Sequence, residues 1–419
     1  MRGKDEILEW LYGLSVHGIK LGLTNITELL HRLGDPQDSF RKIHVAGTDG
    51  KGSTSSMIAS ILMRSGVKVG LYTSPHIIEF NERISVSGRN IPDDDMIRLA
   101  EMLEPIVEDM RKSDMQCTFF EVTTAMAFQY FKESGVEYAV VEVGMGGRFD
   151  ATNVIVPDVS IITIISMEHT FYLGDTLTKI AGEKAGIIKP GVPVVTVNTG
   201  EALRVIEERA SETGSQVIRA DAPASVSAGQ DSVRFSYKGK DYEVGIPGEF
   251  QAMNATMAIE AVSHLPQSER FIGHIEEGLK AVRWPCRMQR LEGLPIILDV
   301  THTKVGSEAL ANDISRIYGK VTTVFGALSD KDIGGILENL SRISERMIIT
   351  VPISERSADI GVIERAAREH MEDVTVVPSI FDALDMGMKM KGDGYLLVTG
   401  SFIMAEDALK WLRRTSAGY

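Results

Sequence analysis

The chain has 419 residues, of which 43% are hydrophobic and 24% are charged, and its formal net charge is −14 at pH 7. This length exceeds that of one ordinary domain, so we expect two domains, each with its own core. The acidic balance argues against a dedicated nucleic-acid-binding protein, which normally carries a basic face. No segment approaches the roughly 20 uninterrupted apolar residues of a membrane span.

The first residues of the chain and its two cysteines indicate the cellular compartment of the protein. Residues 1–6 lead into an amphipathic helix rather than into the apolar core of a signal peptide. Cys117 and Cys286 are too few and too far apart for a disulfide scaffold or a zinc site. We therefore expect a cytoplasmic protein with reduced thiols, and a monomer that binds neither nucleic acid nor membranes.

Apolar patterning predicts that strands alternate with helices over much of the chain. Near-continuous β-branched runs, as at 138–143 and 159–165, are typical of parallel strands covered by helices on both faces. Residues 217–246 look more like short antiparallel strands on a rim. The other predicted elements are a helix–loop–helix at 5–34, a strand at 67–72, and helices at 93–110, 119–131 and 254–265.

A break in the pattern at 283–295 precedes a second series of strands. The break itself holds two prolines. The strands are predicted at 296–300, 322–325, 347–350 and 395–399, and each is followed by helical sequence. Strand–helix alternation predicts doubly wound parallel sheets in an α/β fold. We therefore expect one domain over residues 1–291 and a second, smaller, Rossmann-like α/β domain over residues 292–419.

A glycine-rich segment at residues 44–54 carries the strongest chemical signal. An apolar lead-in (Ile43, Val45) runs into a turn with one lysine, and a hydroxyl pair then opens an amphipathic helix. Backbone N–H groups of such a turn cradle phosphates, the lysine reaches the outer phosphates, and a hydroxyl binds Mg²⁺. The candidate ATP-binding residues are Gly47, Thr48, Asp49, Gly50, Lys51, Gly52, Ser53 and Thr54.

The spacing of this loop departs from the usual GxxxxGK[ST] pattern, because Gly52 separates Lys51 from the hydroxyls. The alternative is a flexible solvent turn. A strand before the turn and a helix after it favour a phosphate-binding loop. We therefore expect the first domain to be a P-loop domain that binds a nucleoside triphosphate.

Three predicted strands end in groups suited to metal and phosphate, and ligands bind parallel sheets where the strands end. These groups are Ser74 and His76, Glu142, and Glu168–His169. Glu142 lies in an otherwise apolar strand, where a carboxylate costs several kcal/mol unless it meets a cation. We expect Glu142 and Ser53 to hold nucleotide-bound Mg²⁺, with a buried salt bridge to Arg148 as the alternative. His169 by itself is more typical of a structural hydrogen-bonding residue.

A second glycine-rich turn, at residues 144–153, follows the strand that contains Glu142. A plain tight turn is the alternative, but Arg148 and Asp150 in one loop beside Glu142 favour the edge of an active site. Lys184 lies in helical sequence rich in small residues, where a lysine is usually a solvated surface charge.

Together these motifs resemble the folylpolyglutamate synthase/dihydrofolate synthase family of the Mur ligase superfamily. The resemblance extends from Gly22 to Ser401, and the central motifs occur in the family's order and spacing. The segments that carry it are Gly47–Ser53, Thr73–His76, Glu82–Ile84, Glu142–Asn153, His169–Thr176 and Glu183–Ile187.

The resemblance implies roles for single residues at the phosphates and metals. Gly50, Lys51 and Ser53 would hold the phosphates and a first Mg²⁺. Ser74 and Glu142 would complete the coordination of that ion. The candidate metal ligands are therefore Ser53, Ser74, Glu142 and His169, where His169 would contact a second Mg²⁺ that bridges the γ-phosphate and the acyl group.

The resemblance also implies a modified lysine and a second set of nucleotide contacts. Lys184 would carry a CO₂-derived carbamate, which replaces its cation by an acid. The candidate catalytic residues are then Lys51, Arg148, His169 and Lys184. Asn254, Arg287, Asp299 and His302 match positions that contact adenosine and phosphates.

The family resemblance implies an ATP-dependent amide ligase that joins L-glutamate to a folate or pteroate-type acid through an acyl phosphate. Asp49 stands where asparagine is usual, and Asp299–Lys304 keeps the family's Asp and His but lacks its Asn–Pro turn. Phe250 and Cys286 are further departures. One alternative is a superfamily ligase for another pterin-like or cell-wall precursor acid, and another is a nucleotide-gated binding protein.

Overall fold

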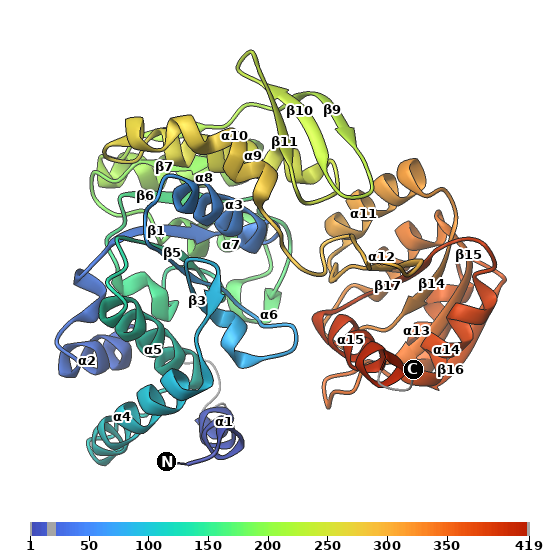
Figure 1. The fold of residues 1–419 in the computed structure, drawn as a ribbon, viewed down its shortest axis with the longest axis horizontal. Coiled ribbons are helices and arrows are strands. Elements are labelled where there is room, and N and C mark those ends of the chain that lie inside the picture. The colour runs from blue at the N-terminus through green and yellow to red at the C-terminus, as the bar shows by residue number, and fades with distance from the viewer. Residues whose placement is uncertain (1, 15–21, 417–419) are drawn as a thin grey trace. The chain divides into compact units, whose positions relative to one another are not determined.

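The computed structural model describes residues 2–14 and 22–416 and divides into two compact units. One unit comprises Met1–Ala222 and Met253–Ala281, and the other comprises Pro223–Ala252 and Val282–Tyr419. Each unit contains a mainly parallel sheet with helices packed on it, so the predicted α/β fold is confirmed (Figure 1). The domain boundary at residues 291 and 292 stays a prediction.

The first unit is built on an eight-stranded sheet with the order β4-β3-β2-β5-β1-β6-β7-β8. Strands β2, β5, β1, β6, β7 and β8 run parallel, and β3 and β4 extend one edge antiparallel. The strands are β1 (Arg41–Ala46), β2 (Val69–Tyr72), β3 (Ile84–Val86), β4 (Arg89–Asn90), β5 (Tyr138–Glu142), β6 (Val159–Ile162), β7 (Val194–Thr196) and β8 (Val217–Arg219).

Helices cover both faces of this sheet. Ala139 and Val141 of β5 share one core with α4 and α5, and α3 contacts β2 and β5. The helices are α1 (Lys4–Gly13), α2 (Thr24–Arg32), α3 (Lys51–Arg64), α4 (Asp93–Lys112), α5 (Phe119–Glu133), α6 (Thr170–Leu173), α7 (Leu177–Ala185), α8 (Gly200–Thr213), α10 (Ile275–Ala281) and, from Met253 onward, α9 (Phe250–Ser263).

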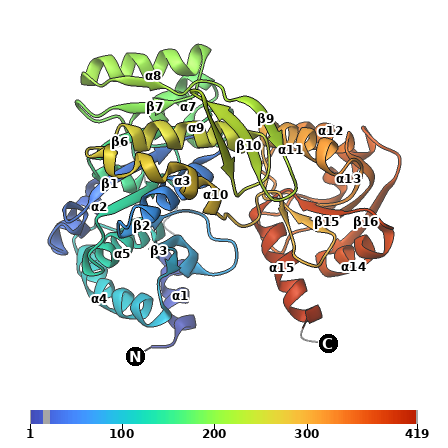
Figure 2. The ribbon, with the colours of Figure 1, turned by 45° about the horizontal axis from the view of Figure 1, so that its top comes forward.

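Helix α3, which begins at the first glycine-rich turn, is held by close packing against α10 (Figure 2). The Ser60 hydroxyl donates to the carbonyl oxygen of Gly278 at 2.7 Å. A Cβ on Gly278 would lie only 2.5 Å from Cα of Ile61, so glycine is what allows the two backbones to approach. The C-terminal half of α3 is therefore held against α10 by backbone contact.

The second unit contains a six-stranded sheet with the order β12-β13-β17-β14-β15-β16 and a three-stranded antiparallel sheet, β11-β10-β9. In the larger sheet only β12 runs antiparallel to its neighbour. The strands are β9 (Ala224–Ala228), β10 (Val233–Tyr237), β11 (Lys240–Val244), β12 (Gln289–Arg290), β13 (Ile296–Leu298), β14 (Val321–Phe325), β15 (Ser344–Val351), β16 (Val374–Ser379) and β17 (Leu396–Thr399). The helices are α11 (Lys304–Ile317), α12 (Ile333–Ser341), α13 (Ile360–Arg368), α14 (Ile380–Met390) and α15 (Phe402–Ser416).

Two strand predictions need correction. The antiparallel strands expected within 217–246 are present as β9, β10 and β11, but Val217–Arg219 pairs parallel with β7 in the large sheet. Strand β16 was missed because it is a half-buried edge strand whose sequence contains Pro378. The predicted helices near the N-terminus are present, and part of the loop that was predicted between them falls on residues 15–21, which lie outside the described residues.

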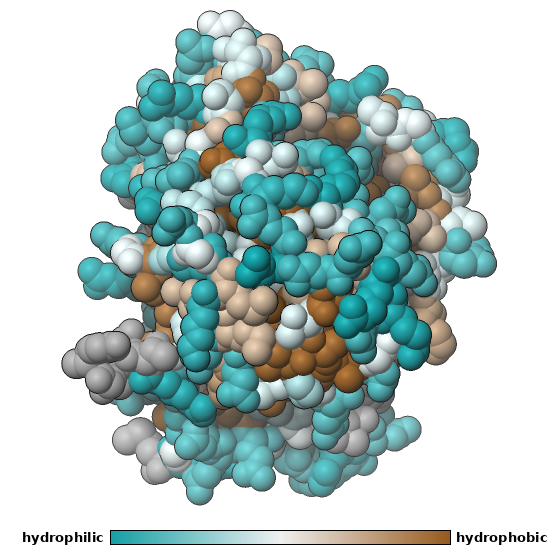
Figure 3. Space-filling view, turned by 90° about the vertical axis from the view of Figure 1, so that its right-hand side faces the viewer, coloured by the Kyte–Doolittle hydropathy of each residue, from teal (hydrophilic) through white to brown (hydrophobic). Residues whose placement is uncertain are grey.

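The face of the molecule drawn in Figure 3 is mainly hydrophilic, with apolar patches between the polar side chains. Such a surface agrees with a chain whose net charge is −14. Within the described part of the chain, no helix combines the length and apolar character that crossing a membrane requires.

Candidate active site

The first glycine-rich turn connects β1 directly to α3, as the sequence predicts. Gly50 is the N-cap of α3 and has φ of 88°, a backbone conformation that favours glycine. A Cβ at this position would lie 2.4 Å from Oδ1 of Asn254. The first N–H groups of a helix have no partner within the helix and lie at its positive end, so this geometry suits an anion.

The turn is tied to the chain that follows β6. The backbone N–H groups of Thr48 and Asp49 both donate to the carbonyl oxygen of Ile164, at 2.8 and 3.3 Å. The N–H of Ser166 donates to the Thr48 hydroxyl at 3.1 Å, and the Ser166 hydroxyl donates to Oδ2 of Asp49 at 3.3 Å. Asp49, which replaces the family's usual asparagine, thus has a hydroxyl partner within this loop.

Two lysines converge on the carbonyl oxygens of the turn. Nζ of Lys51 donates to the oxygens of Gly47 and Thr48 at 3.1 and 3.0 Å. Nζ of Lys184, on α7, donates to the same Gly47 oxygen at 2.6 Å. The structure therefore brings together two predicted catalytic residues that are far apart in the sequence.

Lys184 is buried, with 3% of its surface exposed, so its interpretation as a solvated surface charge is wrong. Burial, and then the neighbouring Lys51 cation, lower the pKa of the Lys184 amine from 10.5 to about 7. The carboxylates of Glu168 and Asp49 act in the opposite direction but do not offset the burial. A large fraction of this amine is neutral near pH 7, which is the nucleophilic form of a lysine.

Glu142, the last residue of β5, is buried, and its Oε2 accepts a hydrogen bond from the N–H of Ser74 at 3.1 Å. Side chains of a strand alternate between faces, so Glu142 lies on the face opposite Val141, which is the face that α3 contacts. Ser53, in the first turn of α3, is also buried. The alternative salt bridge from Glu142 to Arg148 is not formed, because Arg148 instead pairs with Glu183 at 3.4 Å.

The second glycine-rich turn follows β5 and packs tightly on α7. A Cβ on Gly147 would lie 2.7 Å from the carbonyl oxygen of Glu183. Asp150 closes the turn by accepting hydrogen bonds from the N–H groups of Met145 and Thr152, at 2.9 and 3.0 Å. Burial raises the pKa of the Asp150 carboxyl group. Arg148 points outward from this turn, with about half of its side chain exposed.

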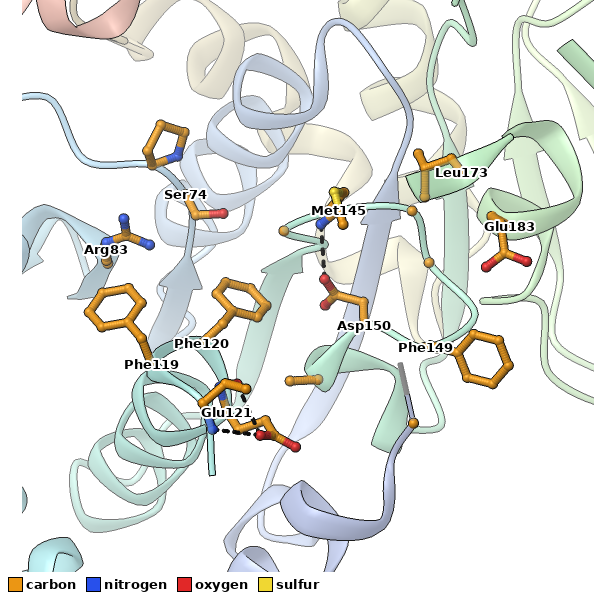
Figure 4. A pocket seen from close by; sticks show the side chains of 17 residues that line it. Ser74, Arg83, Phe119, Phe120, Glu121, Met145, Phe149, Asp150, Leu173 and Glu183 are labelled. Carbon is orange, nitrogen blue, oxygen red and sulfur yellow. Dashed lines mark hydrogen bonds between the residues drawn. The ribbon is translucent and has the colours of Figure 1, made fainter. Parts of the chain in front are cut away.

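A pocket of about 460 Å³ lies between the second turn, the start of α5 and the segment after β2. Figure 4 shows Phe119 and Phe120 on one side of it, Met145 and Asp150 on another, and Arg83 beside Ser74. Most of its lining is apolar or aromatic, with few charged groups. Such a pocket suits a flat organic molecule that also carries a polar or charged group.

His169 is the N-cap of the short helix α6 and has φ of 51°, a left-handed conformation that is uncommon for residues other than glycine. Its Nε2 lies 3.5 Å from Oε1 of Glu168. The structure thus places the two predicted residues of this strand end in contact with each other.

The remaining predicted nucleotide contacts, apart from Asn254, lie in the second unit. Asp299 is buried and accepts hydrogen bonds from the N–H groups of Met288 and Thr301, at 2.9 and 2.7 Å. His302 and Arg287 both lie against the ring of Phe402. The centroid of this ring is 5.7 Å from that of His302 and 5.5 Å from the Arg287 guanidinium. These residues form one cluster within their unit.

The Asn–Pro turn that the family carries after its histidine is replaced by Thr303 and Lys304. The Thr303 hydroxyl caps α11 by accepting from the N–H of Gly306 at 3.0 Å. Lys304 forms an ion pair with Glu338 at 3.3 Å, and both side chains are more than half exposed. In this chain, α11 therefore begins at a Thr303 side-chain cap.

Two family models match this chain. The Mur ligase middle domain matches residues 45–262, and the Mur ligase glutamate ligase domain matches residues 286–402. The chain is also 36% identical over 397 residues to a folylpolyglutamate synthase of Lacticaseibacillus casei, covering 91% of this chain and 92% of that protein. It is 35% identical to a dihydrofolate synthase/folylpolyglutamate synthase of Bacillus subtilis, covering 96% and 98% of the two chains.

The fold agrees with a solved structure of Mycobacterium tuberculosis folylpolyglutamate synthase complexed with ADP. The TM-score is 0.89 at 30% identity, and the match covers 97% of this chain and 98% of that one. The chain belongs to the folylpolyglutamate/dihydrofolate synthase family of Mur ligases.

The residues that this Mur ligase presents fit a magnesium–nucleotide complex. Mg²⁺ prefers hard oxygen ligands and is usually held by one or two carboxylates together with substrate phosphates. The Glu142 carboxylate and the Ser53 hydroxyl supply such oxygens near the anion-binding end of α3. Among the described residues, no three His, Cys, Asp or Glu side chains form a metal-binding group.

The sequence reasoning assigned no role to three residues that line the pocket of this Mur ligase, namely Arg83, Phe119 and Phe120. The aromatic pair was assigned only to an apolar helix, because its period matches helix packing. A signal was present, since Thr118 and Glu121 form a capping box that starts α5 at these aromatics. Arg83 belongs to a family motif segment but has no local pattern that indicates a pocket.

Proposed function

We propose that the protein is an ATP-dependent amide ligase that joins the amine of L-glutamate to the carboxylate of dihydropteroate or a folate. One observation carries the proposal: the turn before α3, the Glu142 carboxylate and the aromatic pocket meet at the carboxyl ends of the adjacent strands β1 and β5. Nucleotide phosphates and an organic acid could therefore lie side by side. The ADP complex of the Mycobacterium tuberculosis relative and the DHPP and ADP complex of the Escherichia coli relative support this reading.

In the proposed reaction, an oxygen of the acid's carboxylate attacks the γ-phosphorus of ATP, and the bond to the β-phosphate oxygen breaks, giving an acyl phosphate and ADP. The amine of L-glutamate then attacks the acyl carbon, loses a proton, and displaces inorganic phosphate. Phosphoryl transfer depends on neutralising and positioning charge. Lys51 and the N–H groups at the start of α3 would supply this at the phosphates.

The proposed Mg²⁺ ligands are Ser53, Ser74 and Glu142 for a first ion, with His169 at a second. Bound Mg²⁺ neutralises phosphate charge and aligns the reacting oxygens. Arg148 would act at the outer edge of the site, since its guanidinium is half exposed beside the second turn. The proposed adenosine and phosphate contacts are Gly47, Thr48, Asp49, Gly50, Gly52, Thr54, Asn254, Arg287, Asp299 and His302.

We further propose that Lys184 forms a carbamate. The neutral amine nitrogen would attack CO₂, form an N–C bond and release one proton, which turns a buried neutral amine into a buried anion. The lowered pKa of the amine supports this, because only the neutral form reacts. A carbamate carbon signal from ¹³CO₂ in the NMR spectrum of the wild type, absent from Lys184→Ala, would support it. An unmodified amine under saturating CO₂ would contradict it.

The proposal includes a cytoplasmic monomer with domains at residues 1–291 and 292–419. Size-exclusion chromatography with light scattering tests the oligomeric state, for which a mass of 45.9 kDa is expected.

The experiment that tests the function combines each candidate acid with each amino acid and follows ADP release, with products identified by mass. We expect ADP release that requires both a pteroate-type acid and L-glutamate, and a product heavier than the acid by one glutamyl residue. Stimulation only by a cell-wall precursor acid would favour a different Mur ligase. ATP turnover that no carboxylic acid stimulates would favour a nucleotide-gated binding protein.

A further inference from the structure

Arg83 is a buried cation in the wall of the pocket. It ends the short 3-10 helix Phe80–Arg83, its residue surface is 8% exposed, and its side chain lines the pocket (Figure 4). It is the one cationic side chain among the described residues that line this pocket. The other charged groups there are the acids Glu121, Asp150 and Glu183.

The direct contacts of the Arg83 guanidinium are with an imidazole and an aromatic ring. Its Nε donates to Nδ1 of His76 at 2.7 Å, and the guanidinium lies 5.2 Å from the centroid of the Phe119 ring. The imidazole of His76 accepts this hydrogen bond at Nδ1 and so holds one edge of the guanidinium. Among the described residues, Glu142 and Glu82 act on Arg83 electrostatically but form no direct ion pair with it.

The adjacent acid, Glu82, acts on Arg83 only electrostatically, because its carboxylate is hydrogen-bonded to the backbone. Its carboxylate accepts hydrogen bonds from the N–H groups of Ile77, Ile78 and Glu79, at 2.7, 3.0 and 2.9 Å. The N–H of Thr73 donates to the carbonyl oxygen of Arg83 at 3.0 Å, which fixes the backbone of this segment. This segment therefore places the Arg83 guanidinium at the pocket, whereas the Glu82 carboxylate is hydrogen-bonded to backbone N–H groups.

Arg83 lies at the end of the pocket that is next to the proposed metal and phosphate site. Ser74 lines the same pocket and donates its N–H to Glu142, the proposed metal ligand. Arg83 and Glu142 interact electrostatically across this short span. A substrate carboxylate that reaches the phosphates would pass several acids, and a buried guanidinium is the group that offsets this repulsion.

We propose that Arg83 binds the carboxylate of the acid substrate that is to be phosphorylated, and that His76 positions the Arg83 guanidinium. This inference rests on the proposed function, whose acid substrate supplies the carboxylate. The planar fork of the guanidinium matches two carboxylate oxygens, which would orient one of them toward the γ-phosphate.

The test compares an acid with its uncharged isostere. Pteroic acid and its primary carboxamide are titrated calorimetrically into the full chain with ADP and Mg²⁺ present. For Arg83→Met we expect the acid to lose about 10- to 100-fold in affinity, as for a lost charge-assisted contact, while the amide changes about twofold or less. The matched control is Arg98→Met, an exposed arginine on α4, which should leave both affinities unchanged.

Variants at His76 separate positioning from packing. His76→Asn keeps an acceptor for the Arg83 Nε and should retain the preference for acid over amide, whereas His76→Phe should reduce it. Arg83→Lys keeps the charge without the fork and should lie between wild type and Arg83→Met. If Arg83→Met does not fold, the affinities of Arg83→Lys for the acid and the amide still test the assignment.

Equal losses for acid and amide in the Arg83 variants, with unchanged thermal unfolding, would overturn the assignment and leave the proposed function intact. A wild type that binds the acid no more tightly than the amide would also overturn it. A wild type that binds neither molecule and forms no glutamyl product would overturn the proposed function and the assignment together.

Discussion

The two glycine-rich turns lie next to each other, because β1 and β5 are parallel neighbours with Val45 opposite Glu142. They use glycine for different purposes. In the first turn, Gly50 takes a left-handed conformation that starts a helix, and Lys51 follows it. In the second, Gly147 lacks a Cβ that would collide with the backbone of α7.

The two turns differ in what their backbone N–H groups can bind. The first turn leads into a helix whose opening N–H groups are available to an anion. In the second turn, Asp150 takes the N–H groups of Met145 and Thr152, and the turn becomes a wall of the aromatic pocket. In this protein, a glycine-rich turn therefore lines a candidate binding site at the end of each of the two strands. The residues that follow the glycines make the first turn suit phosphate and the second suit an organic molecule.

The largest effect should come from Lys51→Ala. Removing the one lysine of the first turn should lower kcat/KM for ligation about 10²–10³-fold, as for other preorganised charge stabilisers, while affinity of the pocket for the acid changes little. Steady-state kinetics with calorimetric binding of the acid checks both parts. Near-wild-type turnover would show that the first turn does not handle the phosphates.

Gly147→Ala tests the structural use of glycine in the second turn. The added Cβ would lie 2.7 Å from the Glu183 carbonyl oxygen and 3.0 Å from that of Lys184, so we expect about 1–3 kcal/mol of destabilisation from overpacking. Urea unfolding measures it. Gly273→Ala is the matched control, because nothing lies within 4 Å of a Cβ there. Equal stabilities for the two variants would remove the contrast between the turns.

Glu142→Gln tests the carboxylate that lies between the two turns. The Mg²⁺ concentration for half-maximal ligation should rise about tenfold or more, because a charged oxygen ligand is lost. Stability should stay equal or rise, since an amide oxygen can still accept from the Ser74 N–H and no buried charge remains. A steep loss of stability with unchanged Mg²⁺ dependence would make Glu142 a structural residue.

The last effect is a pH dependence and concerns Lys184, whose amine contacts the first turn from the helix that packs on the second. Its folded-state pKa is about 7 and its ordinary value is 10.5, so between these values the unfolded chain binds more protons. Its contribution to the free energy of unfolding should therefore rise with pH across that window, by at most about 1.4 kcal/mol per pH unit.

Urea unfolding of Lys184→Met in CO₂-free buffer, from pH 7 to pH 10, should show a flatter profile than the wild type. Lys179→Met is the control, because that lysine is exposed on the same helix. A slope unchanged by Lys184→Met would contradict the buried neutral amine.

Local patterns predicted most of the strands, the two turns and the buried Glu142, because each depends on neighbours within about ten residues. The apolar run Tyr138–Val143 identifies β5 and makes its terminal carboxylate conspicuous. The family resemblance then pointed to Lys184, whose local sequence indicates only a surface charge. The burial of Lys184 depends on how α7 docks beside Gly47, 137 residues earlier in the chain.

The pocket was missed for the same physical reason. Its lining comes from the segment after β2, the start of α5 and the second turn, which only the folded sheet brings together. Arg83 has no direct carboxylate contact from Glu82, because that carboxylate accepts three backbone N–H groups, and no sequence periodicity indicates this feature.

The most direct test of the account follows one oxygen atom. The acid substrate is labelled with ¹⁸O in its carboxylate and incubated with ATP, Mg²⁺ and L-glutamate, and the inorganic phosphate is analysed by mass. If the pocket presents the carboxylate to the γ-phosphate at the first turn, each phosphate released should carry one ¹⁸O from the acid. Unlabelled phosphate alongside a glutamyl product would contradict the acyl phosphate and the side-by-side arrangement of the two turns as one active site.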